Sequence, residues 1–369
     1  MADFDFIETL EQLQKTVGDL KLCKEIAVDI ECENNLHHYG VFISLIQISS
    51  RERNLIVDVL KLKEIKSLLN VLENKDILKV FHDVGFDFRI LKQEFSCNPK
   101  NVFDTQVAAA FLGIEHLGLG ALLEQEFGFK KDKKFQRVDW TKRPLSYAML
   151  HYAVHDTSYL LSLKDILMMK LKEKGRLEWI KEEMIDLEKR DYTYHEQEYK
   201  DLSGFRAMSK QEKAILHVLF DERNRLARKV DRPSFMIMSN KILLGLVVNL
   251  PKNLGEWKML KGVHPMVRLE AGRFFSLVEA ARKGPGEGSV LEKRERMSIE
   301  QGDSLKGLLE LRQRIALKLG IKGHLLMDQD QARDIVISQS LRSLREWQKE
   351  LWLKERRVKE IVSSDSLGC

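Results

Sequence analysis

The sequence predicts an α/β domain with a mixed five-stranded sheet flanked by helices, followed by one or two all-α helical bundles. Short β-rich runs separated by helical stretches occupy the chain through residue 105, whereas the pattern from about Leu117 onward is almost entirely helical. At about 150 residues per domain, 369 residues are enough for two or three domains. A composition of 44% apolar and 32% charged residues excludes a disordered or fibrous protein.

The expected sheet is built from five β-rich runs. They are Glu25–Glu31, Val41–Ser49, Asn54–Val59, Ile77–His82 and Asn101–Asp104. The first three runs are close enough in sequence for hairpin connections, while the last two follow helical segments. Hairpins give antiparallel pairs and helical crossovers give parallel pairs, so the sheet should be mixed.

Domain boundaries are predicted where the helical patterning stops. Residues 190–203 form a polar stretch rich in Tyr and Glu, and residues 283–289 hold three glycines and a proline, which break any helix. We therefore expect an α/β domain over residues 1–195, a helical domain over 203–284, a linker over 285–300 and a second helical domain over 301–362.

The two helical segments resemble each other at an offset of 89 residues. Residues 223–227 (RNRLA) align with residues 312–316 (RQRIA), and Met238 aligns with Met327. This similarity predicts a diverged tandem repeat of small helical bundles.

Charge is distributed unevenly between the two halves of the chain. Residues 1–200 carry a net charge of −5 and residues 201–369 a net charge of +10, with histidine neutral. A basic half suggests that the helical region holds a polyanion, while the acidic half does chemistry that needs carboxylates. Charge alone is equally consistent with a solvated helix surface.

Several classes of protein are excluded. No apolar run approaches the roughly 18 residues of a membrane-spanning helix. Residues 1–10 carry three acids and no basic residue, unlike a secretory or transit peptide, so we expect a cytoplasmic protein. The four cysteines show no Cys-x-x-Cys spacing, which predicts reduced thiols and neither a disulfide framework nor a zinc site.

Two acids mark the end of the first predicted strand. Asp29 and Glu31 follow the apolar run Ile26-Ala27-Val28, and the period of two places both side chains on one face. Two carboxylates on one face repel each other unless a cation neutralises them, and a hard divalent metal ion is the simplest cation for oxygen ligands.

A third acid follows another buried strand. Asp87 lies just after the run Lys79-Val80-Phe81-His82, near the carboxyl end of that strand, where ligand sites of open α/β sheets gather. Asp83 is an alternative for this role, and either acid can instead serve as a helix N-cap.

The last candidates lie on a helical stretch. Tyr152 and Asp156 are four residues apart and share a helix face. His151 stands five residues before Asp156 and is the alternative partner, but a separation of five points about 140° away, whereas a separation of four points about 40° away. This geometry favours Tyr152.

These residues, taken in order, resemble ribonuclease D and the related exosome-associated exonuclease, which are DEDD-superfamily 3′-to-5′ exonucleases of the tyrosine subclass. The resemblance covers about residues 20–190. Its motifs are Asp29-x-Glu31, Leu45-Ile46-Gln47-Ile48, Phe81-His82 leading to Asp87, Phe103-Asp104-Thr105, Asp139-Trp140 through Leu145, and Tyr152-x3-Asp156.

The helical region carries a second resemblance. Residues 231–240 (DRPSFMIMSN) are similar to the HRDC domain, and the repeat that follows fits a second such module. Ile30 and Cys32 depart from the Thr and aromatic residue common around the first acids in bacterial members. That difference affects the contact expected between residue 32 and the terminal nucleotide.

The resemblance implies a ribonuclease H-like exonuclease fold and a metal-dependent exoribonuclease. Asp29, Glu31, Asp87 and Asp156 would hold two Mg²⁺ or Mn²⁺ ions, and Tyr152 would orient the attacking water. The implied substrate is RNA with a free single-stranded 3′ end, such as precursor tRNA, and the implied products are nucleoside 5′-monophosphates. We expect the protein to be a monomer.

Basic residues of the repeat are expected to grip the RNA through its phosphates. They are Arg223, Arg225, Arg228, Lys229, Arg312, Arg314 and Lys318. The alternatives to this function are a single-strand DNA exonuclease of the same superfamily and an inactive nucleic-acid-binding scaffold.

Overall fold

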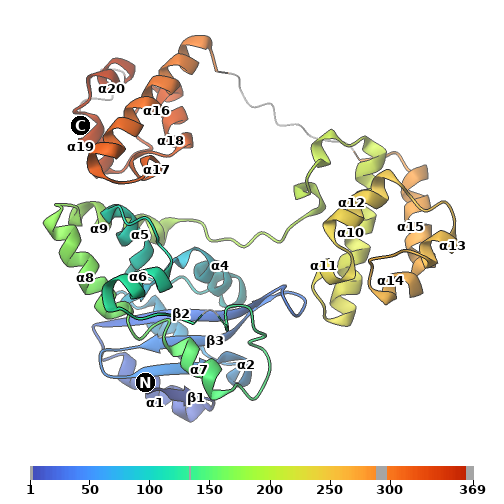
Figure 1. Ribbon diagram of the computed structural model, residues 1–369, viewed down its shortest axis with the longest axis horizontal. Coiled ribbons are helices and arrows are strands. Elements are labelled where there is room, and N and C mark those ends of the chain that lie inside the picture. Colours follow the sequence, from blue (N-terminus) through green and yellow to red (C-terminus); the bar gives the residue numbers. More distant parts are fainter. Residues whose placement is uncertain (1–2, 133, 288–296, 363–369) are drawn as a thin grey trace.

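The computed structural model describes residues 3–132, 134–287 and 297–362. A sheet domain (residues 3–189), a first helical module (210–283) and a second helical module (299–361) follow one another along the chain (Figure 1). The predicted order of a mixed sheet with helices followed by all-α modules is confirmed. Within the described residues, no helix combines the length and the apolar character needed to cross a membrane.

The sheet has six strands in the order β1-β4-β3-β2-β5-β6. The strands are β1 (Asp5–Ile7), β2 (Glu25–Asn34), β3 (Val41–Ser49), β4 (Asn54–Asp58), β5 (Leu78–Phe81) and β6 (Val102–Asp104). Strands β2, β3 and β4 pair antiparallel, and the other pairs are parallel. The five predicted runs are β2 to β6. The sixth strand, β1, was missed because three residues on an edge are too short for an alternation signal.

Helices pack on both sides of this sheet. They are α1 (Leu10–Leu20), α2 (Val59–Leu62), α3 (Lys66–Glu73), α4 (Val84–Phe95), α5 (Thr105–Leu112), α6 (Leu119–Phe127), α7 (Tyr147–Val154), α8 (Leu160–Glu173) and α9 (Leu177–Lys189). Alternation along β2 places Val28 and Ile30 on one face, where they join a large core with residues of α1 and α3. On the other face, Leu45 of β3 and Ile56 of β4 form a separate apolar cluster with Ala153 of α7. Helix α7 therefore lies over the face that carries Asp29 and Glu31.

The two helical modules share their first three elements. The first contains α10 (Lys210–Val230), α11 (Ser234–Ile237), α12 (Asn240–Val248), α13 (Leu254–Lys258), α14 (Pro265–Leu269) and α15 (Ala271–Lys283). The second contains α16 (Ile299–Leu319), α17 (Gly323–Leu326), α18 (Gln329–Ser338), α19 (Glu346–Trp352) and α20 (Arg356–Ile361). Helices α10, α11 and α12 each begin 89 residues before α16, α17 and α18. The tandem repeat inferred from the sequence is thus a repeat of structure.

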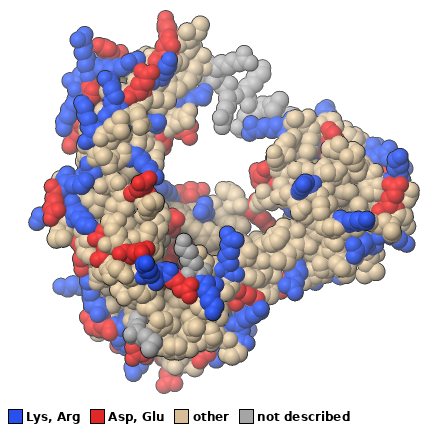
Figure 2. Space-filling view, in the orientation of Figure 1, with Lys and Arg blue, Asp and Glu red and all other residues tan. Residues whose placement is uncertain are grey.

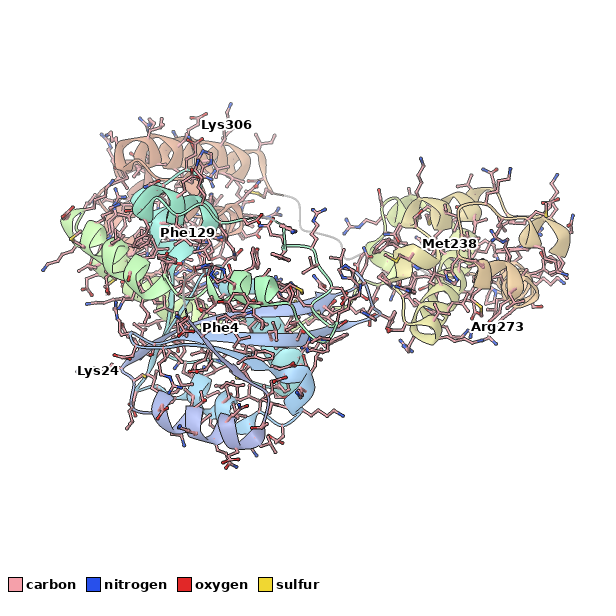
Figure 3. The ribbon with its side chains drawn as sticks, turned by 60° about the horizontal axis from the view of Figure 1, so that its bottom comes forward. Phe4, Lys24, Phe129, Met238, Arg273 and Lys306 are labelled. Atoms are coloured by element: carbon pink, nitrogen blue, oxygen red, sulfur yellow. The ribbon has the colours of Figure 1, made fainter. Side chains whose placement is uncertain are left out.

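One buried bond recurs in both modules. Nη1 of Arg223 donates to the carbonyl oxygen of Met238, and Nη1 of Arg312 donates to that of Met327, each across 15 residues. Met238 lies in the interior of the first module (Figure 3), and both methionines are fully buried. The guanidinium groups therefore fasten the α11 and α17 turns to the long helices.

The second module is docked on α5 and α9 of the sheet domain. The rings of Trp179 and Trp347 stack with centroids 4.6 Å apart, and Arg345 forms ion pairs with Glu183 and Asp186. At Gly113, after α5, a Cβ atom would lie 1.9 Å from the carbonyl oxygen of Gly320. A glycine is needed at this position because the two backbones touch, and because its φ of +81° favours glycine.

The connections bear on the predicted domain limits. Between α9 and α10, residues 190–209 contain two short 3₁₀ turns, Tyr199–Asp201 and Phe205–Ala207. The predicted linker 285–300 lies largely outside the described residues, and α16 begins within it, at Ile299, after the N-cap Ser298. The domain limits themselves stay a prediction.

The loop between α6 and α7, residues 128–146 (the α6–α7 loop), is fastened to the sheet by Arg143. Its Nε and Nη2 donate to the two carboxylate oxygens of Asp58 at 2.6 and 2.7 Å. Asp58 is completely buried. We predict that Arg143→Ala destabilises the sheet domain by roughly 3–5 kcal/mol, because a buried carboxylate loses its partner. The midpoint of urea unfolding, followed by circular dichroism, measures this loss.

The matched control is Lys142→Ala. The Lys142 side chain is 79% exposed and lies 3.9 Å from Asp139, so its removal should change the unfolding free energy by less than about 1 kcal/mol. Equal midpoints for the two variants would show that the Arg143–Asp58 pair does not fasten the loop.

Candidate active site

The site begins on β2, next to the centre of the sheet. Asp29 lies opposite Gln47 of β3, and Glu31 lies opposite Leu45, so both acids point to the face that α7 covers. The register of this pair of strands shifts between Glu31 and Cys32. The bulge ends the regular ladder directly after the second acid.

Asp156 joins this pair from the turn between α7 and α8. One carboxylate oxygen from each of Asp29, Glu31 and Asp156 lies within 4.8 Å of the others. Asp156 is 5% exposed. Three acids that are far apart in the sequence therefore meet as an acidic cluster, as predicted for a metal site.

Asp87 faces the same cluster from the first turn of α4. It is buried, and its pKa is raised well above the ordinary value by burial and then by the nearby charges of Asp29, Asp83 and Glu31. Its carboxylate lies outside the group of three that meet within 4.8 Å. Asp83, the alternative residue, is exposed at the N-cap with a φ of +64°. Burial and charge favour Asp87 over Asp83.

The cluster is costly to keep charged. Burial raises the pKa of Asp29 to about 6, and burial together with the charge of Asp29 raises the pKa of Glu31. Like charges out of water disfavour the ionised form, and a bound cation reverses this effect. Hard oxygen donors in a buried, mutually repelling set fit Mg²⁺ or Mn²⁺.

Tyr152, not His151, faces the acids. Tyr152 is buried between the rings of Phe135 and Trp140, and its pKa is raised by burial and by the charges of Glu31 and Asp29. His151 instead packs edge-on against His155, with ring centroids 4.5 Å apart. The choice made from helix geometry agrees with this arrangement.

Lys131 was not found from the sequence. It lies on the α6–α7 loop, forms an ion pair with Asp156, and places its Nζ 4.5 Å from the centre of the Tyr152 ring. Burial lowers the pKa of Lys131, while attraction to Asp29 and Glu31 raises it. The sequence signal for this residue was the basic run at residues 130–134. Such a run is equally typical of a solvated loop.

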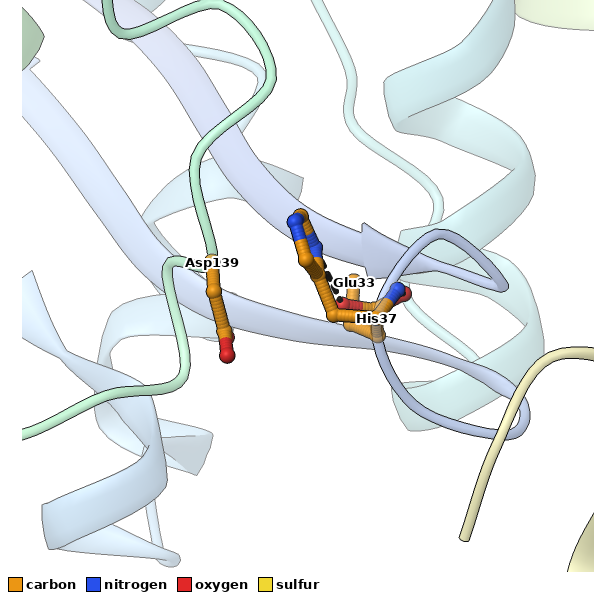
Figure 4. A group of neighbouring side chains, drawn as sticks. All are labelled: Glu33, His37 and Asp139. Atoms are coloured by element: carbon orange, nitrogen blue, oxygen red, sulfur yellow. Dashed lines mark hydrogen bonds and ion pairs between the residues drawn. The ribbon is translucent and has the colours of Figure 1, made fainter. Parts of the chain in front are cut away.

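A second group of possible metal ligands lies at the hairpin that follows β2. Glu33, His37 and Asp139 each place one ligand atom within 4.8 Å of the others (Figure 4). One oxygen of Glu33 accepts from the backbone N–H groups of Leu36 and His37, and the other lies 3.4 Å from His37 Nδ1. These bonds show that Glu33 stabilises the turn between β2 and β3.

The predicted RNA-gripping residues divide into paired and exposed groups. In the first module, Arg223 is 3% exposed and donates to Asn240, while Arg225 and Lys229 pair with Glu270. The structure therefore places Arg223 inside the module, not on a surface that RNA can reach. Arg312 makes the equivalent interior bond.

Arg228, Arg314 and Lys318 are exposed. Arg228 donates to the hydroxyl of Tyr39, on the β2–β3 hairpin. Lys and Arg side chains are prominent over the second module at the upper left of the space-filling view (Figure 2).

The match to known families agrees with this fold. Residues 4–172 match the family described as 3'-5' exonuclease, and residues 212–278 match the HRDC domain. The chain therefore contains a 3′-5′ exonuclease domain of the DEDD class followed by an HRDC domain. In sequence it is similar, more closely, to the ribonuclease D and RRP6 proteins. The family implies divalent metal ions.

The curated relatives include proteins of different length. The exosome complex exonuclease RRP6 of Saccharomyces cerevisiae is 33% identical over 295 residues, which are 75% of this chain and 40% of that protein. The chain thus spans less than half the length of this relative. Ribonuclease D of Desulfotalea psychrophila is 26% identical over 351 residues, or 91% of both chains.

Two solved structures are similar. Escherichia coli RNase D superposes with a TM-score of 0.72 at 23% identity, over 98% of this chain and 100% of that one, which supports the fold. The catalytic core of RRP6 from Trypanosoma brucei has a TM-score of 0.68 at 29% identity, over 76% of this chain and 80% of that chain.

The repulsion within the cluster predicts a gain in stability when one acid is removed. In EDTA at neutral pH, Asp29→Asn should raise the free energy of unfolding by about 1–3 kcal/mol, because a buried charge disappears. The folded pKa of about 6 lies above the ordinary 3.8, so the penalty grows as pH rises through this window and is absent below it. Thermal unfolding at about pH 4 and about pH 7 measures the difference.

Addition of Mn²⁺ should then raise the melting temperature of the wild type much more than that of the variant, because Asp29 is a proposed ligand. The control Asp83→Asn changes an exposed acid and should behave as wild type in both conditions. A destabilised Asp29→Asn protein in EDTA would contradict the repulsion argument.

Proposed function

We propose that the chain is a metal-dependent 3′-to-5′ exoribonuclease that releases nucleoside 5′-monophosphates from RNA with a free single-stranded 3′ end. The observation that carries the proposal is the convergence of Asp29, Glu31 and Asp156, with Asp87 and Tyr152 beside them, on one buried face. The similarity to an exosome exonuclease and to ribonuclease D supports RNA over DNA as substrate.

Asp29, Glu31, Asp87 and Asp156 would hold two Mg²⁺ or Mn²⁺ ions. When bound, such ions supply charge stabilisation and a reactive water at neutral pH. The protein contributes a rigid strand for two acids, a helix turn for the third and the α7–α8 turn for the fourth. Ligands fixed on separate elements favour one bound geometry over many.

Tyr152 would orient the attacking water. A phenol has an ordinary pKa near 10, so Tyr152 is protonated at neutral pH and can donate a hydrogen bond to the water. Positioning, not proton abstraction, is therefore its proposed role.

Arg228, Arg314 and Lys318 would hold the RNA body through its phosphates, in an interaction that weakens with salt. Arg225 and Lys229 would contribute where their pairs with Glu270 open. As the natural substrates we propose precursors of tRNA and other small stable RNAs, processed at their 3′ ends by a monomer.

The test is the digestion of uniformly labelled single-stranded RNA and matched DNA in Mg²⁺ or Mn²⁺. Asp156→Asn should lower the rate of mononucleotide release by at least about 10³-fold, because ligand loss removes several kcal/mol of transition-state stabilisation. Asp83→Asn is the matched control and should keep wild-type activity. Preferential digestion of DNA would replace the proposal with a DNA exonuclease, and absence of any metal-dependent release would indicate a binding scaffold.

Substitution of the tyrosine tests its positioning role. Tyr152→Phe removes the hydroxyl and keeps the ring packing, so kcat should fall by about 10²-fold with little change in KM for RNA. His151→Gln is the comparison and should leave kcat unchanged. A larger loss of kcat for His151→Gln than for Tyr152→Phe would indicate that His151 orients the attacking water.

A further inference from the structure

Gln47 is a buried polar residue to which the proposed chemistry assigns no role. It lies in the middle of β3 and is completely buried. Neither its Nε2 nor its Oε1 has a hydrogen-bond partner among the described residues. A buried amide without partners loses its hydration and gains no bond in return, so an apolar side chain at this position would be the more stable choice.

The neighbours of Gln47 show what its amide can reach. Its cross-strand neighbours on the same face are Asp29 of β2 and Ile56 of β4. Directly opposed residues of an antiparallel pair have Cβ atoms about 4.5–5.5 Å apart, within reach of a long side chain. Asp29 is therefore the hydrogen-bond acceptor directly across the ladder from this amide.

The other surroundings offer little competition. The preceding residue on this face, Leu45, is apolar, as are Ala153 and Val154 of the cluster above it. The polar atoms of that cluster are the Tyr152 hydroxyl, which is assigned to the attacking water, and Nε1 of Trp140, which is a donor and cannot accept from the amide. The following residue, Ser49, has its hydroxyl 2.7 Å from Thr157 Oγ1 and 2.8 Å from Asn54 Oδ1, so it is already engaged. The polar amide of Gln47 thus lies under the acidic cluster with Asp29 as the group it can serve.

We propose that Gln47 is a positioning residue of this site, which orients the Asp29 carboxylate for metal binding through an amide N–H, directly or through one buried water. One oxygen of Asp29 would then be available as a metal ligand, while the other would accept from Gln47. Hydrogen bonds to ligating carboxylates fix their direction, and their loss lowers metal affinity by about 10–100-fold. A glutamate would instead add a further negative charge to the cluster.

This inference rests on the proposed metal-dependent function. It predicts opposite effects on stability and on metal binding. The bond to Asp29 is proposed for the metal-bound state, and in EDTA the Gln47 amide has no partner among the described residues. Gln47→Met replaces this amide with an apolar side chain of similar length, so stability in EDTA should stay equal or rise, because an unsatisfied buried group is removed. A merely structural glutamine would show the reverse, a loss of stability with unchanged metal affinity.

The chain offers a matched control in Gln348, which is also buried but fully bonded. Its Nε2 donates to the carbonyl oxygen of Leu326 at 3.0 Å, and its Oε1 accepts from the N–H of Arg345 at 2.9 Å. Gln348 belongs to the second helical module. Gln348→Met should therefore lower the melting temperature and leave metal affinity unchanged.

The experiment measures Mn²⁺ binding to the full-length protein by electron paramagnetic resonance of the free ion, without RNA, and melting temperature in EDTA. We expect Gln47→Met to raise the Mn²⁺ dissociation constant about 10–100-fold with no loss of melting temperature. A second variant, Gln47→Leu, repeats the test with a different shape. In both variants, excess Mn²⁺ should restore exonuclease activity, which a misfolded site would not allow.

Two negative outcomes are distinct. Wild-type Mn²⁺ affinity in Gln47→Met and Gln47→Leu, with binding still dependent on Asp29, would overturn the role of Gln47 alone. Absence of Asp29-dependent Mn²⁺ binding in the wild type would overturn the proposed function and this inference together.

Discussion

The mutual repulsion of buried carboxylates is the constraint around which the sheet domain is organised. Asp29 and Glu31 occupy a strand that is hydrogen-bonded on both sides, and Asp156 and Asp87 are brought to them from two other elements. Burial raises the pKa of Asp29, Glu31 and Asp87, and nearby carboxylates raise the pKa of Glu31 and Asp87 further, so the folded protein holds these charges against their preference. The energy to do so comes from the two apolar cores on either face of the sheet. The cluster therefore costs the fold stability locally, as is common at functional sites.

The α6–α7 loop closes the site by interactions at both of its ends. Near its start, Lys131 pairs with Asp156, and near its end Arg143 is held by Asp58. In the middle, the carbonyl oxygen of Trp140 accepts from the hydroxyl of Ser44 on β3. Trp140 in turn packs against Tyr152. The loop therefore contacts the acidic cluster, Tyr152 and the sheet, so a change in its position would alter the surroundings of all three.

Local pattern was enough to predict the sheet and the acids, because both depend on strong short-range signals. Alternation and hairpin spacing located β2 to β6, and the period of two placed Asp29 and Glu31 on one face. Residues whose role is set by distant partners could not be predicted. Lys131 has no local sequence pattern that separates it from a solvated lysine. The sequence around Arg223 is typical of a surface residue, and its bonds to Met238 and Asn240 are visible only in the structure.

The two helical modules share an internal bond, but they are attached to the sheet domain in different ways. Both modules keep the same arginine-to-carbonyl bond, but the second is fixed on α5 and α9 by the Trp179–Trp347 stack and by backbone contact at Gly113. This packing is apolar and close, so it stabilises the contact between the second module and the sheet domain.

The first module instead meets the sheet domain at the β2–β3 hairpin. Asp231 accepts from His38 and from the N–H of Tyr39, and Arg228 lies over the Tyr39 ring. These contacts are polar and exposed, and the module is otherwise joined by the irregular segment 190–209. The hairpin continues the strand that carries Asp29 and Glu31. If the basic first module binds RNA as proposed, the load would act on the same strand that carries the proposed metal ligands Asp29 and Glu31, so that substrate binding and the geometry of the acidic cluster would be connected through one continuous piece of backbone.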